Sequence, residues 1–310
     1  DASAGALYGA RGANGVVMIT TKRGREGKAT VSLRSTLGWA SRALPKYDLV
    51  GQKDFVQLTY ESLRNGYIFD AGYSWEEAEA EARNMLGANL GARGGELYNP
   101  FKNYAWADLI DPATGMVHPD AQSAWDENWF DAVTRSNVPR HEHQLSINGG
   151  TNKTQYMVSL GYLNEEGLLV NTSFQRYSAR SNVNSAVTDW FSLNLNASLA
   201  HSMQNFSDYS GSAVSNVWYS AQFVSPLFPV YIKDLAGNDV LDENGERQLD
   251  YGEAGRAGSY NDYNPLGGLL DDKADTKHDV AGVRTGVVFG SDKDSFGLFK
   301  GLKLAINFGT

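Results

Sequence analysis

The stretch Phe191-Ser-Leu-Asn-Leu-Asn-Ala-Ser-Leu199 alternates between apolar and polar side chains without a break. Successive side chains of a β-strand point to opposite faces of the sheet, so this period of two predicts a strand with one apolar face. The preceding segment, Arg176 to Asn184, shows nearly the same alternation and is separated from the first by a short turn. Together the two segments predict a pair of antiparallel strands that share an apolar face.

Other segments of the chain show the same period. Each carries apolar side chains at alternate positions, with Asn, Ser, Arg or Lys between them, and tyrosine or tryptophan lies near several segment ends. These segments lie at residues 28–42, 141–149, 156–162, 281–289 and 302–308. We therefore expect a mainly β protein with about seven strands.

The connections between these segments alternate in length. They are long after the first strand and at Met203, short near Gly149, Ser185 and Asp292, and moderate near Glu165. Membrane barrels have short periplasmic turns and longer external loops, whereas a soluble sandwich has connections of more even size. The rhythm therefore favours an antiparallel transmembrane β-barrel, with every long connection on the external side.

The long connection after the first strand contains two helix patterns. Apolar residues recur at helical spacing over residues 54–64, and Asn65-Gly66 follows as a C-terminal stop signal. Ser74 and Glu77 match a capping box at the start of an Ala/Glu-rich segment that Gly87 closes. We expect a few short helices inside long loops.

Composition excludes several classes of protein. The 310 residues carry a formal net charge of −9, which disfavours a nucleic-acid surface, and no cysteine, which excludes disulfides and thiol chemistry. No apolar run approaches the roughly 20 residues that a membrane helix needs. The first residue is Asp and no signal-peptide pattern follows it, so we expect an internal or processed piece of a longer protein.

The N-terminal stretch Tyr8-Gly-Ala-Arg-Gly-Ala-Asn-Gly15 is rich in glycine and precedes an apolar, β-branched segment, Val16 to Thr21. Glycine permits positive φ angles and close backbone contacts, so a tight turn followed by a buried strand is predicted. Phosphate-binding glycine loops instead follow a strand and open a helix, which makes a nucleotide site a poor explanation.

The stretch from Leu7 to Gly24 resembles the end of the plug domain in SusC/RagA-type TonB-dependent outer-membrane transporters. Further similar segments are Asn128-Trp-Phe-Asp-Ala-Val133, residues 143–151, residues 156–162 and Phe174-Gln-Arg-Tyr177. The resemblance covers nearly the whole chain and is weakest over residues 67–116 and 209–222.

The resemblance implies a domain plan and a function. Residues 1–27 would be the C-terminal end of a plug, and residues 28–310 the first part of a barrel of about 22 strands when complete. Long extracellular loops would span residues 42–139 and 203–277. The family imports oligosaccharides or peptides across the Gram-negative outer membrane without catalysing a reaction. Its partners are TonB, contacted through a segment missing here, and a SusD-like surface lipoprotein; no cofactor is expected.

Two groups of residues are candidate contacts. Loop aromatics offer large stacking surfaces for a glycan or peptide ligand. The alternative uses are packing of the loops on one another and a position at the membrane interface. These aromatics are Trp106, Trp125, Trp129, Tyr209, Trp218 and Tyr219. The plug motif is expected to contact the barrel wall, with ligand contact as the alternative for its Arg and Asn. Its residues are Tyr8, Gly9, Arg11, Gly12, Asn14 and Gly15.

Other chemistry is less well supported by the sequence. His141 and His143 share a strand face but have no third metal ligand at a suggestive spacing. Asp239 to Glu246 departs from the EF-hand pattern, and a solvated hairpin around Asn244-Gly245 is the better prediction. The alternative function is a surface adhesin or a glycan-degrading enzyme on a β scaffold. A close pair of carboxylates in a loop cleft would favour the enzyme, and the plug segment disfavours a passive porin.

Overall fold

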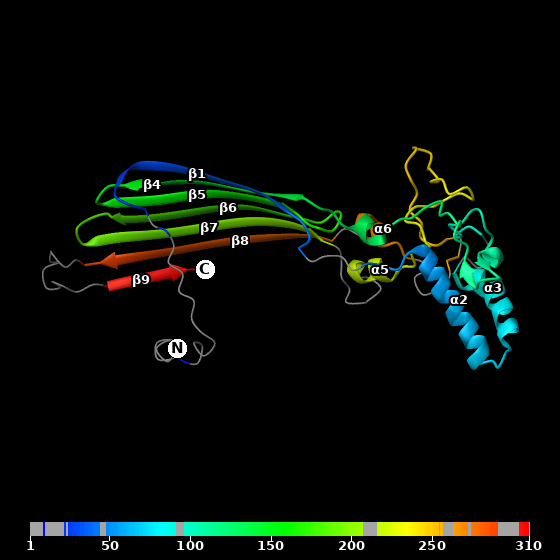
Figure 1. Ribbon diagram of the computed structural model, residues 1–310. Coiled ribbons are helices and arrows are strands. Elements are labelled where there is room, and N and C mark those ends of the chain that lie inside the picture. Colours follow the sequence, from blue (N-terminus) through cyan, green and yellow to red (C-terminus); the bar gives the residue numbers. More distant parts are fainter. Residues whose placement is uncertain are drawn as a thin grey trace.

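The computed structural model describes residues 9, 22, 24–43, 48–90, 96–206, 216–253, 255–256, 263–271, 274–290 and 304–309. It has two parts, a long curved sheet and a module of helices and loops at one end of the sheet (Figure 1). The module comes from the two long connections between strands. The sheet and the module are thus interleaved along the chain.

Seven strands form one antiparallel sheet in the order β1-β4-β5-β6-β7-β8-β9. Within this sheet each strand pairs with the sheet strands that come before and after it in the chain. This pairing confirms the expected mainly β architecture of antiparallel strands. The strands are β1 (Gly27–Ala40), β4 (Val138–Gly150), β5 (Thr154–Glu166), β6 (Ser173–Ala186), β7 (Phe191–Phe206), β8 (Ala274–Phe289) and β9 (Leu304–Gly309).

The register places the apolar residues of all strands on one face. Val31 pairs with Ile147, which in turn pairs with Val158, so the alternation seen in each strand is aligned across the sheet. This face is open: Leu33 is 73% exposed and Leu199 is 57% exposed. An exposed apolar face of this extent marks a surface that contacts another protein or a membrane.

The apolar run shifts along the strands from one side of the sheet to the other. It is centred on Ser35 in β1, on Leu195 in β7 and on Thr285 in β8. The register carries Ser35 across to His201 and Asp279, so the run has moved by about six residues, or about 20 Å, toward the short turns. Over four to five strand spacings of about 4.8 Å, this is a slope of about 40–45°, similar to the strand tilt in membrane barrels.

The connection lengths follow the predicted alternation. Short turns at residues 151–153 and 187–190 lie at one end of the sheet. The connections 41–137, 167–172 and 207–273 all lie at the other end. The turn predicted near Asp292 lies outside the described residues.

The module contains several short helices and strands. They are α2 (Gln52–Phe69), α3 (Trp75–Leu90), the 3-10 helix η2 (Trp106–Asp108), β2 (Ile110–Asp111), β3 (Met116–Val117), α4 (Trp129–Val133), α5 (Val217–Phe223) and α6 (Pro265–Asp271). Most of the fully buried side chains of the described residues lie here and not in the sheet, including Tyr60, Phe101 and Leu227, each 0% exposed. None of the described helices is both long enough and apolar enough to cross a membrane.

The first helical hairpin confirms one sequence signal and corrects two. Ser74 and Glu77 form the predicted capping box, with the Glu77 carboxylate accepting from the Ser74 amide at 3.0 Å. The predicted stop at Asn65-Gly66 is wrong, because α2 continues to Phe69. Gly87 does not end α3 either: a Cβ at this position would lie 2.9 Å from the Trp106 indole, so glycine is required by packing.

Most of the plug motif lies outside the described residues, namely Tyr8, Arg11, Gly12, Asn14 and Gly15. Gly9 is described and has a φ of +61°, a conformation that favours glycine. Gly24 lies against the backbone of Tyr156 at the start of β5, where a Cβ would come within 2.4 Å of the Tyr156 amide nitrogen. The chain thus passes close to the short-turn end of the sheet before β1 begins.

The two faces of β7 generate a test in the full-length protein. Leu195→Arg places a charge at the centre of the apolar run, and we expect it to lower the free energy of unfolding by about 2–4 kcal/mol. Asn194→Arg, one residue away on the polar face, is the matched control and should cost little. Urea unfolding in detergent or lipid measures both. Equal losses from the two variants would contradict the register.

Candidate functional site

The polar face of the sheet is rich in Ser, Asn, Gln and Arg. The alternation of side chains places five arginines on it, Arg34, Arg140, Arg176, Arg180 and Arg284, with two glutamates, Glu142 and Glu165. Both glutamates bind the same arginine: Arg140 is 3.1 Å from Glu142 and 3.3 Å from Glu165. The other four arginines form no ion pair with any described residue. This face is therefore positively charged although the whole chain is negative.

Amides continue this polar surface toward the short turns. Asn182, on β6, donates from its side chain to Asn196 on β7 and accepts from Asn184 at 3.0 Å. Asn182 is 8% exposed, and its neighbours are partly exposed. The surface thus offers amide donors and acceptors beside guanidinium groups, which suits hydrogen bonding to a polar solute and does not by itself provide a catalytic group.

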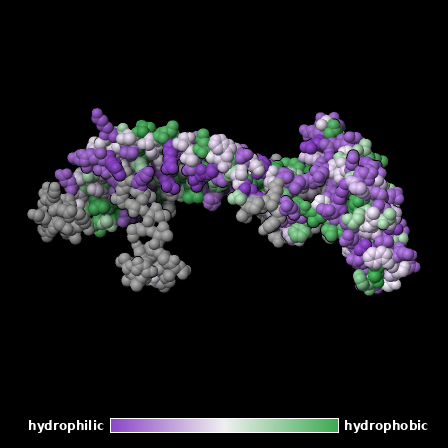
Figure 2. Space-filling view, in the orientation of Figure 1, coloured by the Kyte–Doolittle hydropathy of each residue, from purple (hydrophilic) through white to green (hydrophobic). Residues whose placement is uncertain are grey.

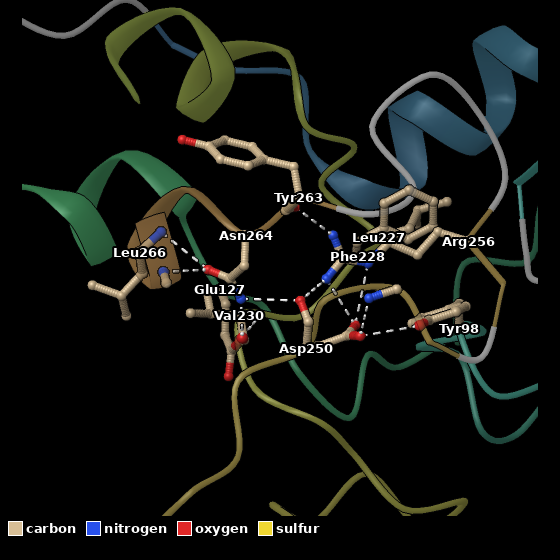
Figure 3. A network of polar contacts seen from close by, with 12 residues as sticks. Tyr98, Glu127, Leu227, Phe228, Val230, Asp250, Arg256, Tyr263, Asn264 and Leu266 are labelled. Carbon is tan, nitrogen blue, oxygen red and sulfur yellow. Dashed lines mark hydrogen bonds and ion pairs between the residues drawn. The ribbon is translucent and has the colours of Figure 1, made fainter. Parts of the chain in front are cut away.

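A buried ion pair lies within the second long connection, and Tyr98 links it to the first (Figure 3). The guanidinium of Arg256 is fully buried and lies 3.0 Å from the carboxylate of Asp250. Tyr98 donates to the same carboxylate at 3.1 Å, and the Gly252 amide donates to it at 2.8 Å. Arg256 also donates to the Tyr263 carbonyl at 3.2 Å. Most polar groups of the pair are thereby satisfied, as a buried charge requires.

Aromatic rings enclose this ion pair. The Arg256 guanidinium carbon lies 5.6 Å from the centre of the Trp129 ring and 5.5 Å from that of Phe228. Burial, reinforced by the neighbouring Asp250, raises the pKa of Tyr98 to about 12. The phenol therefore remains a neutral donor at physiological pH, and the cluster acts as a fixed structural joint.

Asn264 extends the joint to α6. Its amide nitrogen donates to the Val230 carbonyl at 2.9 Å and to the Asp250 carbonyl at 3.0 Å. Its side-chain oxygen accepts from the amides of Leu266 and Gly267, which caps the start of α6.

Glu127 makes a second tie between the two long connections. Its carboxylate binds the Val230 amide and the Lys233 ammonium, each at 2.6 Å. Lys233 also binds Asp239 at 2.5 Å. Burial lowers the pKa of Lys233, but these carboxylate hydrogen bonds outweigh the burial and leave the pKa raised.

Three of the predicted contact aromatics are buried in the module. Trp106 and Trp125 are each 5% exposed, and Trp129 is 2% exposed. The Trp125 indole donates to the Leu227 carbonyl at 3.0 Å and the Trp129 indole to the Phe228 carbonyl at 2.9 Å. The Trp125 and Trp129 rings pack one long connection onto the other, whereas Trp106 lies against Gly87 of its own connection.

Two further predicted aromatics lie on α5. Trp218 packs against Phe130, with ring centres 5.4 Å apart. Tyr219 stacks on Phe223 at 4.2 Å, and the two rings are 37% and 58% exposed. Tyr209 lies outside the described residues. The sequence patterns did not single out Phe223, whose ring stacks on that of Tyr219 one helical turn earlier.

The two histidines of β4 belong to a row of polar and aromatic side chains on the otherwise apolar face. His143 lies 2.7 Å from the Ser35 hydroxyl, and its ring stacks on Tyr162. The His141 ring is 5.4 Å from that of His143. No cluster of three or more metal-ligating side chains is found among the described residues.

Two concavities of the described residues bear on the enzyme alternative. One, of about 700 Å³, lies on the apolar face and contains a single carboxylate, Asp279. The other, of about 140 Å³, lies on the polar face, and the one carboxylate among its lining residues is Glu142. Glycoside hydrolysis normally uses two facing carboxylates, so neither concavity has the arrangement that would favour an enzyme.

The buried ion pair predicts how the module responds to mutation in the full-length protein. Asp250→Asn leaves the Arg256 charge buried without compensation, which should cost about 3–5 kcal/mol. Amide hydrogen exchange across the module should then accelerate by at least about a hundredfold. Glu253→Gln, at an exposed carboxylate of the same segment, is the control. Unchanged protection in Asp250→Asn would show that the pair does not hold the connections together.

Relatives are found along most of the sequence. The chain is 28% identical over 233 residues to the TonB-dependent receptor SusC of Bacteroides thetaiotaomicron, which covers 74% of this chain and 17% of that protein. It is 25% identical over 238 residues to the TonB-dependent receptor P3 of Formosa agariphila, covering 76% and 18%. The chain thus spans less than a fifth of the length of these curated relatives. No family model matches it.

Solved structures share the fold. The RagAB peptide importer in its open-open state superposes with a TM-score of 0.63 at 20% identity, over 100% of this chain and 30% of that one. The closed-closed state gives a TM-score of 0.59 at 19% identity. The relatives are named as receptors and the structural neighbours as transporters. Over three quarters of its length the chain is thus similar in sequence to TonB-dependent receptors, SusC among them, and it shares the fold of the RagAB peptide importer.

Proposed function

We propose that this chain is part of an outer-membrane transporter that actively imports an oligosaccharide or an oligopeptide, driven by TonB. The observation that carries the proposal is the exposed apolar face whose slope of about 40–45° matches the tilt of membrane-spanning strands. In this arrangement the apolar face contacts the lipid of a Gram-negative outer membrane. The opposite, arginine-rich face lines the interior.

The proposed domain plan follows the sequence similarity. Residues 1–27 form the end of a plug and residues 28–310 form barrel wall, with extracellular loops at 42–139 and 203–277. The plug motif contacts the barrel wall in this plan. Gly24, which follows the motif within residues 1–27, lies against the backbone of Tyr156.

The interior wall and the loop module have different tasks in this proposal. The Asn and Arg side chains of the polar face form hydrogen bonds to a polar solute and orient it as it passes. The joints around Asp250 and Glu127 hold the long connections together above the wall. Tyr219, stacked on Phe223, provides an exposed ring for ligand contact. A SusD-like surface lipoprotein acts together with this external module.

An uptake assay in cells expressing the full reading frame tests the function. Fluorescent oligosaccharides and oligopeptides of defined length are the probes, and accumulation is compared with and without TonB. We expect one class to accumulate inside the outer membrane only when TonB is present. Binding at the cell surface without accumulation would favour the adhesin, product release would favour the enzyme, and TonB-independent entry would favour a passive pore.

A further inference from the structure

The helical hairpin of α2 and α3 projects away from the sheet (Figure 1), and the turn at its end carries exposed aromatic side chains. Phe69 is 81% exposed, Trp75 is 55% exposed and Tyr73 is 44% exposed. We call these three residues the tip aromatics. Figure 2 shows a hydrophobic patch at this end of the hairpin, within a module that is otherwise mostly hydrophilic on the visible face.

One face of each helix of the hairpin is already buried. Val56 and Tyr60 of α2 and Ala82 and Leu86 of α3 are each 0% exposed. The hairpin therefore has its hydrophobic core without the tip aromatics. Large apolar rings that add nothing to the core and cost solvation are characteristic of interaction surfaces.

The backbone of the tip is held by local hydrogen bonds. The Asp70 amide donates to the Gly66 carbonyl at 2.9 Å, and the Tyr73 amide donates to the Tyr67 carbonyl at 3.0 Å. Gly72 adopts a φ of +74°, and the capping box of Ser74 then starts α3. A turn of this kind changes little on binding, which reduces the entropic cost of association.

Neighbouring side chains also hold two of the tip aromatics, Trp75 and Tyr73. The Arg64 guanidinium lies 4.5 Å from the centre of the Trp75 ring. Tyr73 stacks on Tyr67, with ring centres 5.5 Å apart. Aromatic residues held in one orientation are typical anchors of protein interfaces, where they enter a pocket on the partner.

Acidic residues surround the tip. Residues 61–81 contain six carboxylates and one arginine, a net charge of −5. A second copy of the chain would bring the same negative charge, so self-association through this surface is opposed by repulsion. A partner with lysine or arginine around an apolar pocket would be attracted to it.

We infer that the tip aromatics dock into an apolar pocket with a basic rim on a partner protein. Given the proposed function, that partner is the surface lipoprotein of the transporter. The experiment below distinguishes this partner from a glycan ligand.

Co-purification tests the docking surface in the full-length transporter, co-expressed with the lipoprotein from its native locus. Phe69→Ser and Trp75→Ser should each lower the amount of bound lipoprotein by about tenfold or more, as expected for interface anchors. Leu235→Ser is the matched control, because Leu235 is 70% exposed but belongs to the other long connection. Glu76→Lys should also weaken the complex, and most strongly at low salt.

The outcomes separate this inference from the proposed function. Wild-type levels of lipoprotein on both serine variants, in a wild-type background that imports substrate, would overturn the docking surface. Loss of glycan retention with normal lipoprotein binding would also overturn it and assign the tip to a ligand. A wild-type protein that fails to import with or without TonB would refute the transporter proposal, whatever the co-purification shows. Protease protection of the module shows that each variant is folded.

Discussion

The hydrogen-bonding requirement of the backbone dominates this structure. In an apolar environment an unpaired amide or carbonyl costs several kcal/mol, so a spanning strand needs a neighbour on each side. The register from β1 to β9 satisfies this requirement through the middle of the sheet and aligns every apolar run on one face. The two edge strands, β1 and β9, each have one described neighbour. A membrane location therefore requires further strands beside both of them.

The charge of the molecule is divided between its two parts. The connections 41–137 and 207–273 carry 26 carboxylates and 12 lysines or arginines, whereas the polar face of the sheet carries five arginines and two glutamates. The net charge of −9 is thus the sum of a basic polar face on the sheet and an acidic module. In the proposed transporter the polar face of the sheet faces a solute inside the barrel, and the module faces solvent and the partner lipoprotein. The hydrogen bond from Tyr98 to Asp250 and the ion pair of Lys233 with Glu127 join the connections into one body, so that the acidic surface is borne on a fixed scaffold.

Local patterns predicted the sheet better than the module. The alternation around Leu195 and the capping box of Ser74 depend on residues close in sequence, and both are confirmed in the structure. The helix ends predicted at Gly66 and Gly87 are misplaced. At Gly87 the glycine is required by contact with Trp106, which is distant in sequence. Burial of Trp129 likewise depends on Phe228, and the joint at Arg256 is formed by residues from separate connections. Such contacts leave no periodic signal in the sequence.

The most direct test of the account is a spin-label scan of residues 192–199 on β7, in the full-length protein reconstituted into lipid. Oxygen partitions into hydrocarbon, whereas a nickel chelate stays in water, so their collision rates report the environment of each label. The account predicts that oxygen access is high at Leu193, Leu195 and Leu199 and low at the intervening positions, with the chelate showing the opposite phase. Equal access at neighbouring positions, or greater chelate access at the leucines, would contradict a lipid-facing apolar wall.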